Sequence, residues 1–261
     1  MSAEPGTGVG LKELLLNRRW MMFSEPFKHL IARDVFVQPF YERLVRAFQE
    51  VLDRGLSDKV DEHKFSRNMN NYDAYGIAIP EEPPFNVFCS QEIHDLIENL
   101  FEIKATGDIA GSLHTHKVGG KNGFIHNDLN PAKFPKRKAN DHRAFYNPAA
   151  YDQGGRAQGP QEQTVMRAIS VIYYLNNGNW QYGDGGETGL YSSLDQDPYY
   201  PTVQVPPLNN LMMAFECTPY SYHAFISNRA RPRNSIIFWL HADYDETVQR
   251  WGKENFVWWD K

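Results

Sequence analysis

The sequence predicts one mainly β domain with a helical N-terminal part, on three observations. Before about residue 107, apolar residues recur at three- and four-residue spacing, which is typical of helices that pack one face on a core. Beyond it, short apolar or alternating segments are separated by Gly, Pro and Asn, which indicates the strands of a sandwich or barrel. No fixed-period repeat and no biased linker divides the 261 residues. We therefore expect a single domain over 1–261, with 1–106 as mostly helical support and 107–245 as the β core.

Three helices are expected in the N-terminal part. Residues 11–23 (LKELLLNRRWMMF) have an amphipathic pattern. Residues 38–53 follow, with Pro39 in the first turn, where its missing N–H has no helical partner to lose. Ser90 can cap a third helix over 91–102, in which apolar residues again recur at helical spacing. These helices would cover one side of a β-sandwich.

The β core is expected to begin after the third helix. The predicted strands are 109–117, 123–127, 168–175, 187–191, 211–216, 222–226 and 234–241. Each is bounded by residues that favour turns.

A long irregular segment, 129–168, separates the second and third of these strands. Connections of this length are usually lids, binding loops or disordered segments. Its Lys and Arg residues outnumber its Asp and Glu residues, so we interpret it as an inserted loop or lid that suits an anionic substrate. The candidate substrate contacts are Lys133, Arg137 and Arg143. The plainer alternative is a solvated charged loop.

Composition excludes several classes of protein. Only two cysteines, Cys89 and Cys217, exclude a disulfide scaffold and a multi-thiolate zinc module, so a metal would need imidazole and carboxylate ligands. The 41% hydrophobic and 23% charged residues are ordinary for a soluble domain, and a net charge of −5 provides no basic footprint for nucleic acid. No stretch is long and apolar enough to span a membrane, and the first residues lack signal-peptide features. We expect a cytoplasmic protein without nucleic-acid or membrane partners; the sequence leaves its oligomeric state open.

Metal-binding chemistry is suggested by a His-x-Asp triplet, which occurs twice. One lies at 126–128 (His-Asn-Asp) and the other at 241–243 (His-Ala-Asp). On a strand the two side chains of such a triplet share a face, although many triplets are surface accidents. A facial triad of two histidines and one carboxylate needs a third ligand from another strand. Only the first triplet is followed by such a histidine, His223.

A candidate carboxylate-binding pair follows His223. Arg233 lies ten residues on, and Ser235 shares its strand face, so a guanidinium and a hydroxyl could hold a carboxylate together. Arg229 and Arg231 have the same strand parity and are rivals for this contact. The spacing and Ser235 favour Arg233.

These residues carry a resemblance to a known family. His126, Asp128, His223 and Arg233, in this order and spacing, resemble the Fe(II)- and 2-oxoglutarate-dependent dioxygenase superfamily, in particular its prolyl 4-hydroxylase-like branch. The resemblance covers roughly residues 105–245. Several matches in the right order are far more specific than any one of them.

Three further stretches agree with the resemblance. Residues 172–176 (IYYLN) resemble the strand that follows the first metal pair in oxygen-sensing prolyl hydroxylases. Residues 185–188 (GGET) resemble a Gly-Gly-Glu stretch of collagen-type relatives. The spacing between Arg233 and Trp239 matches as well.

The resemblance implies a double-stranded β-helix (jelly roll) that holds Fe(II) through His126, Asp128 and His223. It further implies 2-oxoglutarate as cosubstrate and ascorbate as a candidate reductant, with O2 consumed and succinate and CO2 released. The cosubstrate-binding candidates are Arg233, Ser235, Tyr174 and His116, and Trp239 is a further substrate-binding candidate. The carboxylate of Asp128 favours hydroxylation over halogenation, because halogenating relatives have a small residue in its place.

The expected substrate is a small, anionic or amino-acid-like metabolite or natural-product intermediate. A peptidyl, prolyl-type substrate is the alternative within the same chemistry. A jelly-roll protein that binds a ligand without catalysis is the alternative from another class, and a zinc hydrolase is a third possibility.

The remaining histidines and the second cysteine receive structural roles. The pair formed by His114 and His116 could bind metal in another kind of centre, but no carboxylate stands at matching spacing. We expect His29 and His94 to face solvent, and Cys217 to be a buried bystander.

Overall fold

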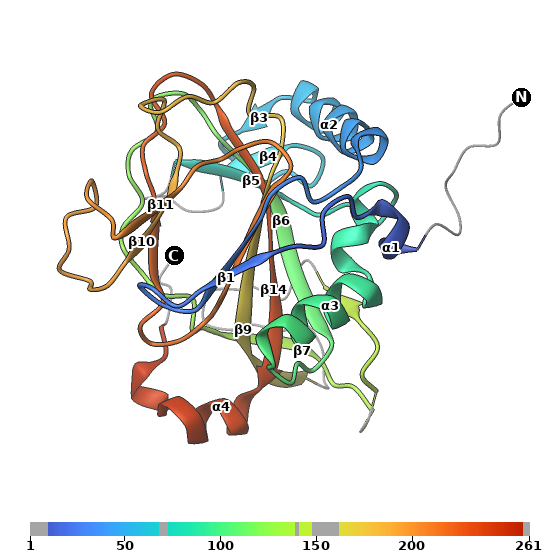
Figure 1. Ribbon diagram of the computed structural model, residues 1–261. Helices are drawn as coiled ribbons and strands as arrows, with labels where there is room; N and C mark the ends of the chain where they lie inside the picture. Colours follow the sequence, from blue (N-terminus) through green and yellow to red (C-terminus); the bar gives the residue numbers. More distant parts are fainter. Residues whose placement is uncertain (1–9, 68–72, 139–140, 148–161, 258–261) are drawn as a thin grey trace, which may run out of the picture.

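The computed structural model describes residues 10–67, 73–138, 141–147 and 162–257. The protein is mainly β, with a large mixed sheet, a smaller antiparallel sheet and a few helices. Helices α2 and α3 lie on one side of the large sheet, and strands β10 and β11 of the small sheet lie on the other (Figure 1). Among the described residues, no helix has the length and apolar character needed to cross a membrane.

The helices follow the sequence prediction where the amphipathic pattern is long. They are α1 (Leu11–Leu14), α2 (Gln38–Asp53), α3 (Gln91–Phe101) and α4 (Tyr244–Trp251), with 3-10 turns at Phe85–Cys89 and Lys253–Asn255. The prediction for 38–53 is confirmed at both ends. The Ser90 hydroxyl accepts a hydrogen bond from the Ile93 N–H and so begins α3 as predicted. The helix ends at Phe101 because Glu102 adopts a left-handed φ of 58°.

The large sheet joins segments from both halves of the chain. Its order is β1 (Met21–Phe23), β2 (His29–Ala32), β12 (Leu211–Glu216), β9 (Glu162–Tyr174), β14 (Arg233–Asp243), β6 (Asp108–His116), β5 (Ala74–Ala78), β4 (Phe65–Arg67) and β3 (Leu56–Ser57). In addition, β7 (Pro131–Pro135) pairs with β9, and β8 (Phe145–Tyr146) pairs with β6. The small sheet has the order β11 (Val203–Val205), β10 (Thr188–Tyr191), β13 (Tyr222–Phe225).

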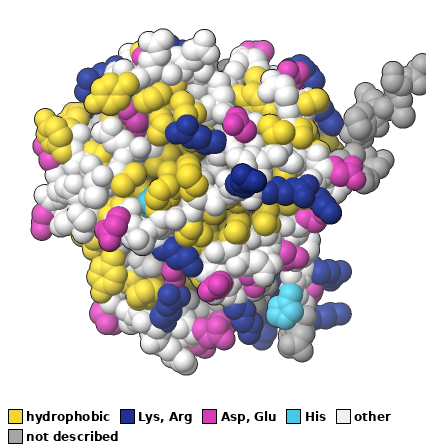
Figure 2. Space-filling view, viewed as in Figure 1, with side chains coloured by type: hydrophobic (Ala, Val, Ile, Leu, Met, Phe, Trp, Pro, Cys, Tyr) yellow, Lys and Arg dark blue, Asp and Glu magenta, His cyan; other side chains and the backbone are white. Residues whose placement is uncertain are grey.

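The N-terminal part is less helical than predicted. The helix expected over 11–23 is wrong beyond Leu14, because Met21–Phe23 form the edge strand β1. The strand is three residues long and all of its side chains are exposed, so it has no periodic signal. Apolar side chains gather on the face of the molecule that β1 crosses (Figure 2). Strands β2 to β5 also lie before residue 107, beside the predicted helices.

Two histidines of this part were expected at the surface and are buried. His29 and His94 are each 1% exposed. His29 lies on β2, and its Nδ1 is 2.9 Å from the Phe27 carbonyl oxygen. His94 lies on α3, and its Nδ1 is 3.1 Å from an Asp95 carboxylate oxygen. Each imidazole is buried with a polar partner, as buried polar groups require.

The segment 129–168 is only in part a loop. Residues 131–135 form β7, which pairs antiparallel with β9, and β9 itself begins at Glu162, before the predicted start. Residues 131–135 and 162–168 of the expected lid are therefore part of the large sheet. Residues 139–140 and 148–161 lie outside the described part of the chain.

The strand expected at 123–127 is replaced by a single β-bridge. His126 pairs antiparallel with His223 outside any named strand. The other predicted strands are confirmed, with 211–216 matching β12 at both ends and the rest shifted by a few residues.

The two faces of the large sheet have different compositions. The face toward the helices is an apolar core with aromatic pairs such as Phe88 with Phe238, whose ring centroids are 6.0 Å apart. The opposite face packs on the small sheet through a second apolar cluster that includes Ile172, Leu190 and Met213. Because successive side chains of a strand point to opposite faces, β9 and β14 contribute to both.

Candidate metal centre

Three predicted ligands, His126, Asp128 and His223, meet at one point between the sheets. Each offers one ligand atom, and the three atoms lie within 4.8 Å of one another. The two histidines are joined through their backbones, because each N–H donates to the other's carbonyl at 3.1 and 2.8 Å. The Nε2 atoms of His126 and His223 lie 3.8 and 3.7 Å from the Asp128 carboxylate oxygens.

Local hydrogen bonds orient both imidazoles. The Nδ1 of His126 is 2.8 Å from the Phe124 carbonyl oxygen, and the Nδ1 of His223 is 3.1 Å from that of Ser221. A carbonyl can only accept, so each Nδ1 carries the proton and each Nε2 presents a lone pair. Burial, and then the neighbouring His223, lowers the pKa of His126 to about 3. Burial also lowers the pKa of His223. Both rings are therefore neutral, as metal ligation requires.

The carboxylate of Asp128 is held by two donors. Arg167 Nη1 donates to Oδ1 at 3.1 Å, and Trp239 Nε1 donates to Oδ2 at 2.7 Å. Burial alone would raise the pKa of Asp128, but the Arg167 guanidinium and the Trp239 indole hold it well below its usual range. The group is a carboxylate at every ordinary pH.

A buried cationic pocket lies on the same face of β14. Arg233 is 3% exposed, and its guanidinium donates to the hydroxyls of Ser235 and Thr188, each at 3.1 Å. The Tyr174 hydroxyl is 2.6 Å from Thr188 Oγ1. Among the described residues, no carboxylate contacts Arg233. A buried guanidinium whose described neighbours are neutral is suited to an incoming anion.

His116 completes this pocket. It pairs with Arg233 across β6 and β14, and its ring stacks on Phe225 with centroids 3.9 Å apart. Burial, followed by the charge of Arg233, lowers its pKa well below the ordinary value. The imidazole is therefore neutral beside the guanidinium.

Residues 147–241 match the family model of the 2OG-Fe(II) oxygenase superfamily. This span contains His223, Arg233 and their strands, and the rest of the triad stands beside it in space. The match and the triad together indicate an enzyme of this superfamily. Fe(II) and 2-oxoglutarate are the metal and the cosubstrate of its members.

Solved structures of prolyl hydroxylases share the fold. A prolyl 4-hydroxylase from Phytophthora capsici is 18% identical with a TM-score of 0.50, and the match covers 82% of this chain and 58% of that one. A Pseudomonas putida prolyl-4-hydroxylase is 15% identical with a TM-score of 0.50, covering 82% of this chain and 91% of that one. A Trichoplax adhaerens prolyl hydroxylase, solved with a hypoxia inducible factor peptide fragment, is 14% identical with a TM-score of 0.50, covering 85% and 86%. At these identities the likeness extends to the fold alone.

The donor set of this oxygenase fits Fe(II). Two neutral imidazoles and one carboxylate form the ligand set of non-haem iron centres with open positions. Two ligands at about 2.1 Å from one ion stand at most about 4.2 Å apart. The separations of 3.7 and 3.8 Å between the carboxylate oxygens and the imidazole nitrogens are within that span.

The alternatives to Arg233 and to the 126–128 triplet make other contacts in the oxygenase. Arg231 pairs with Asp184 at 3.1 Å, and the Arg229 backbone N–H donates to the Asp184 carbonyl. In the second triplet, His241 Nδ1 donates to the Asp108 carbonyl at 2.8 Å, while Asp243 caps α4. This triplet therefore has structural roles, in agreement with the choice of 126–128.

The basic side chains expected to contact substrate are in local ion pairs. Lys133 lies 3.4 Å from Glu162, and Arg137 lies 3.4 Å from Asp108. Arg143 pairs with Asp141 at 3.0 Å, and its side chain is 86% exposed. None of the described contacts joins them to the triad. The plainer interpretation of their charge is favoured, because nearby carboxylates compensate it.

Trp239, a substrate-binding candidate, contacts the metal ligand Asp128. Two further contributors to the site, Thr188 and Arg167, were not predicted from the sequence. Thr188 bridges Arg233 and Tyr174, and the 185–188 motif in the sequence was a signal for it. Arg167 had no signal, because its position in β9 has the parity of Ile169 and Val171, which face the helices.

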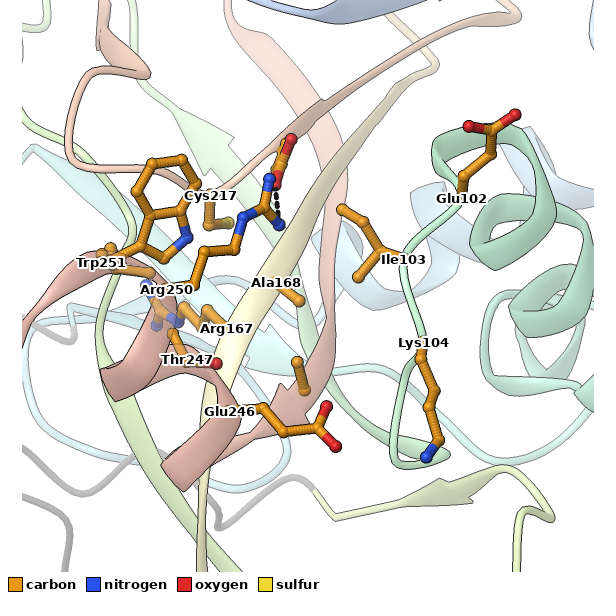
Figure 3. A pocket seen from close by; sticks show the side chains of 13 residues that line it. Glu102, Ile103, Lys104, Arg167, Ala168, Cys217, Glu246, Thr247, Arg250 and Trp251 are labelled. Atoms are coloured by element: carbon orange, nitrogen blue, oxygen red, sulfur yellow. Dashed lines mark ion pairs between the residues drawn. The ribbon is translucent and has the colours of Figure 1, made fainter.

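A hollow of about 160 Å³ lies at the end of the large sheet next to α4 (Figure 3). Its lining includes Ala168 of the helix-side core, and Ile103 and Ala242, which pack against that core. Arg250 and Glu216 form an ion pair of 2.7 Å on its wall. Arg167 is the residue that this hollow shares with the metal centre.

Proposed function

We propose that this chain is a hydroxylase that oxidises a C–H bond of a small, anionic or amino-acid-like organic substrate, on a jelly-roll scaffold. One oxygen atom of O2 enters the substrate, and the other enters succinate as 2-oxoglutarate loses CO2. Two sheets that enclose the triad between them support the jelly-roll assignment.

One observation carries the proposal: the triad and an uncompensated buried guanidinium share one interior. The Arg233 side chain lies on the triad side of β14, because it has the strand parity of Trp239, which contacts Asp128. It also donates to Thr188 of β10, the strand paired with the one that carries His223. A dicarboxylate that reaches both sites neutralises Arg233 at one end and supplies oxygen donors to a metal at the other.

Each residue then has a defined task. His126, Asp128 and His223 would hold Fe(II), which when bound supplies the activation of O2. Arg233 and Ser235 donate to the distal carboxylate of 2-oxoglutarate. Thr188 and the Tyr174 hydroxyl orient that pair, and neutral His116 closes the pocket without adding charge.

The test uses 2-oxoglutarate turnover, which needs no knowledge of the prime substrate. Anaerobic addition of Fe(II) and 2-oxoglutarate should give the visible absorption of an iron-chelated 2-oxo acid. Admission of O2 should then release succinate. Absence of both signals in folded, Fe(II)-supplied protein would contradict the proposal and favour a ligand-binding protein without catalysis.

Fewer basic side chains support an anionic substrate than the sequence suggested. Lys133, Arg137 and Arg143 are compensated by neighbouring acids. Lys136 and Lys138 are further exposed basic residues of this stretch. A screen of carboxylated metabolites for stimulated succinate release tests this class. A matched panel of proline-containing peptides tests the peptidyl alternative, and stimulation by peptides alone would reject the small-molecule assignment.

A further inference from the structure

An irregularity in strand pairing places Arg167 in the metal centre. Leu240 of β14 pairs with Ile169 of β9, but the next residue, His241, pairs with Arg167. Ala168 is therefore an extra, unpaired residue, a β-bulge. A shift of one residue moves all following side chains to the other face of a strand. The bulge thus turns Arg167 away from the helix side and toward Asp128.

Arg167 and Trp239 form one assembly around Asp128. Each donates to a different oxygen of the carboxylate, at 3.1 and 2.7 Å. The guanidinium carbon lies 4.0 Å from the centroid of the Trp239 ring, so the two donors also pack on each other. The side chains of Arg167 and Asp128 are 10% and 5% exposed, so water competes little for these bonds.

The two bonds restrict the motion that a carboxylate ligand otherwise retains. The last torsion of an aspartate side chain is broad, so a lone carboxylate rotates and presents its lone pairs in many directions. Donors on both oxygens, from two different strands, fix the carboxylate plane. The remaining lone pairs are then directed to the space between His126 and His223.

We propose that Arg167 and Trp239 are positioning residues that hold Asp128 in its metal-binding orientation before the metal arrives. The inference rests on the proposed function in that Asp128 is taken as a metal ligand. It adds the residues that act through Asp128 and a reason for the bulge in β9.

Two conservative variants isolate positioning from charge. Trp239→Phe removes one donor and keeps an aromatic ring for the guanidinium. Arg167→Lys keeps the positive charge and removes the planar stack and the fixed reach to Oδ1. Neither changes the net charge beside the metal, so a change in metal affinity reports orientation.

The chain provides a matched control on the outer wall of the same hollow. Arg250 also stacks on a tryptophan, with its guanidinium carbon 4.5 Å from the Trp251 ring centroid, and pairs with the carboxylate of Glu216. It does not contact the triad in the described structure. Arg250→Lys therefore changes the same kind of assembly without reaching Asp128.

The measurement is Co(II) binding by anaerobic titration, with the Co(II) electronic spectrum as the signature of ligand geometry. Loss of a hydrogen bond to a metal ligand typically weakens binding by about 10- to 100-fold. We expect Trp239→Phe and Arg167→Lys each to raise the Kd about 10-fold and alter the spectrum, and Arg250→Lys to stay within about two-fold of wild type. The double variant should bind only slightly more weakly than the weaker single variant, because either loss already frees the carboxylate.

The outcomes separate this inference from the proposed function. Wild-type Kd and spectrum in folded Trp239→Phe and Arg167→Lys would overturn positioning, whatever the succinate assay gives. The expected affinity loss together with no succinate from the wild type would uphold positioning and reject the oxygenase activity. If Arg167→Lys fails to fold, Trp239→Phe decides alone.

Discussion

The two faces of strands β9 and β14 differ in what their buried side chains do. Toward the helices, Tyr173 and Phe238 pack in an apolar core. Toward the small sheet, the same strands present Arg167, Tyr174, Arg233, Ser235 and Trp239, which are polar and joined by hydrogen bonds. Period-two alternation thus allows one pair of strands to carry stability on one face and chemistry on the other.

Two buried charges on the chemical face are neutralised in different ways. On the chemical face, Asp128 is compensated by Arg167, whereas Arg233 has neutral hydroxyls and rings but no carboxylate among its described contacts. The charge of Asp128 is neutralised within the protein, whereas the charge of Arg233 is neutralised when an anionic ligand binds. Variants of each face should therefore have separable effects on activity and stability.

The largest expected effect is on the triad. Asp128→Ala or His223→Ala should reduce succinate release by at least about 1,000-fold, since removal of a ligand leaves no competent metal site. Succinate formation with a circular-dichroism check of folding measures it. Asp243→Ala is the control from the second triplet; it removes the cap of α4 and should leave turnover unchanged. Turnover by Asp128→Ala equal to wild type would reject the triad.

The apolar face should respond in stability instead. Phe238 is fully buried, so Phe238→Ala should lower the free energy of unfolding by about 3–5 kcal/mol. Urea titration measures the loss, and Phe145→Ala, at a residue that is 41% exposed, is the surface control. A variant that stays folded should retain its KM for 2-oxoglutarate; a KM raised tenfold would show that the two faces are coupled.

The cationic pocket should control cosubstrate affinity. Arg233→Ala should raise the KM for 2-oxoglutarate by about 10- to 100-fold, because charge-assisted hydrogen bonds are worth about 1.5–3 kcal/mol each. Steady-state kinetics in 2-oxoglutarate measures it. Arg231→Ala, which removes the ion pair to Asp184, should leave this KM unchanged. An unchanged KM in Arg233→Ala would point to another anchor.

The smallest effect concerns pH and His241. Burial, opposed by the hydrogen bond to the Asp108 carbonyl, lowers the pKa of this imidazole from 6.5 to about 3. Below pH 6.5 the unfolded chain binds a proton that the folded protein excludes, so stability is complete above that pH and falls toward pH 3. The slope is at most about 1.4 kcal/mol per pH unit.

Unfolding free energies of wild type and His241→Gln between pH 7 and 5 isolate this contribution. The nearby Arg167 lowers the pKa of His241 further. Burial raises the pKa of Asp108, so this group makes stability increase as the pH falls, and it does so equally in wild type and variant. The variant should show the shallower slope. Equal slopes in wild type and His241→Gln would show that His241 is protonated in the folded state.

The sequence predicted those elements whose pattern is long or whose neighbours are fixed by it. Residues 38–53 and 211–216 carry enough periodicity to place both ends of α2 and β12. Spacing and strand parity identified His126, Asp128, His223 and Arg233 as candidate site residues. The structure places the first three together.

The features that were missed depend on contacts distant in sequence. Met21–Phe23 become a strand only by pairing with β2, and 131–135 only by pairing with β9. Arg167 contacts Asp128 because a β-bulge turns its side chain to the other face of β9. The order of apolar and polar residues in the sequence does not indicate where such a bulge occurs. Parity arguments are valid only within an unbroken register.

The backbone bridge between His126 and His223 determines how the protein handles the loss of its metal. Folding, rather than the ion, closes the long chain segment between these two ligands, so the entropy of loop closure does not enter the binding equilibrium. Chelators should therefore strip the site without unfolding the domain, in contrast to small zinc domains whose fold depends on the ion. Exchange of one divalent ion for another then becomes an ordinary reversible equilibrium, and the metal content of the isolated protein reflects its surroundings rather than its folding history.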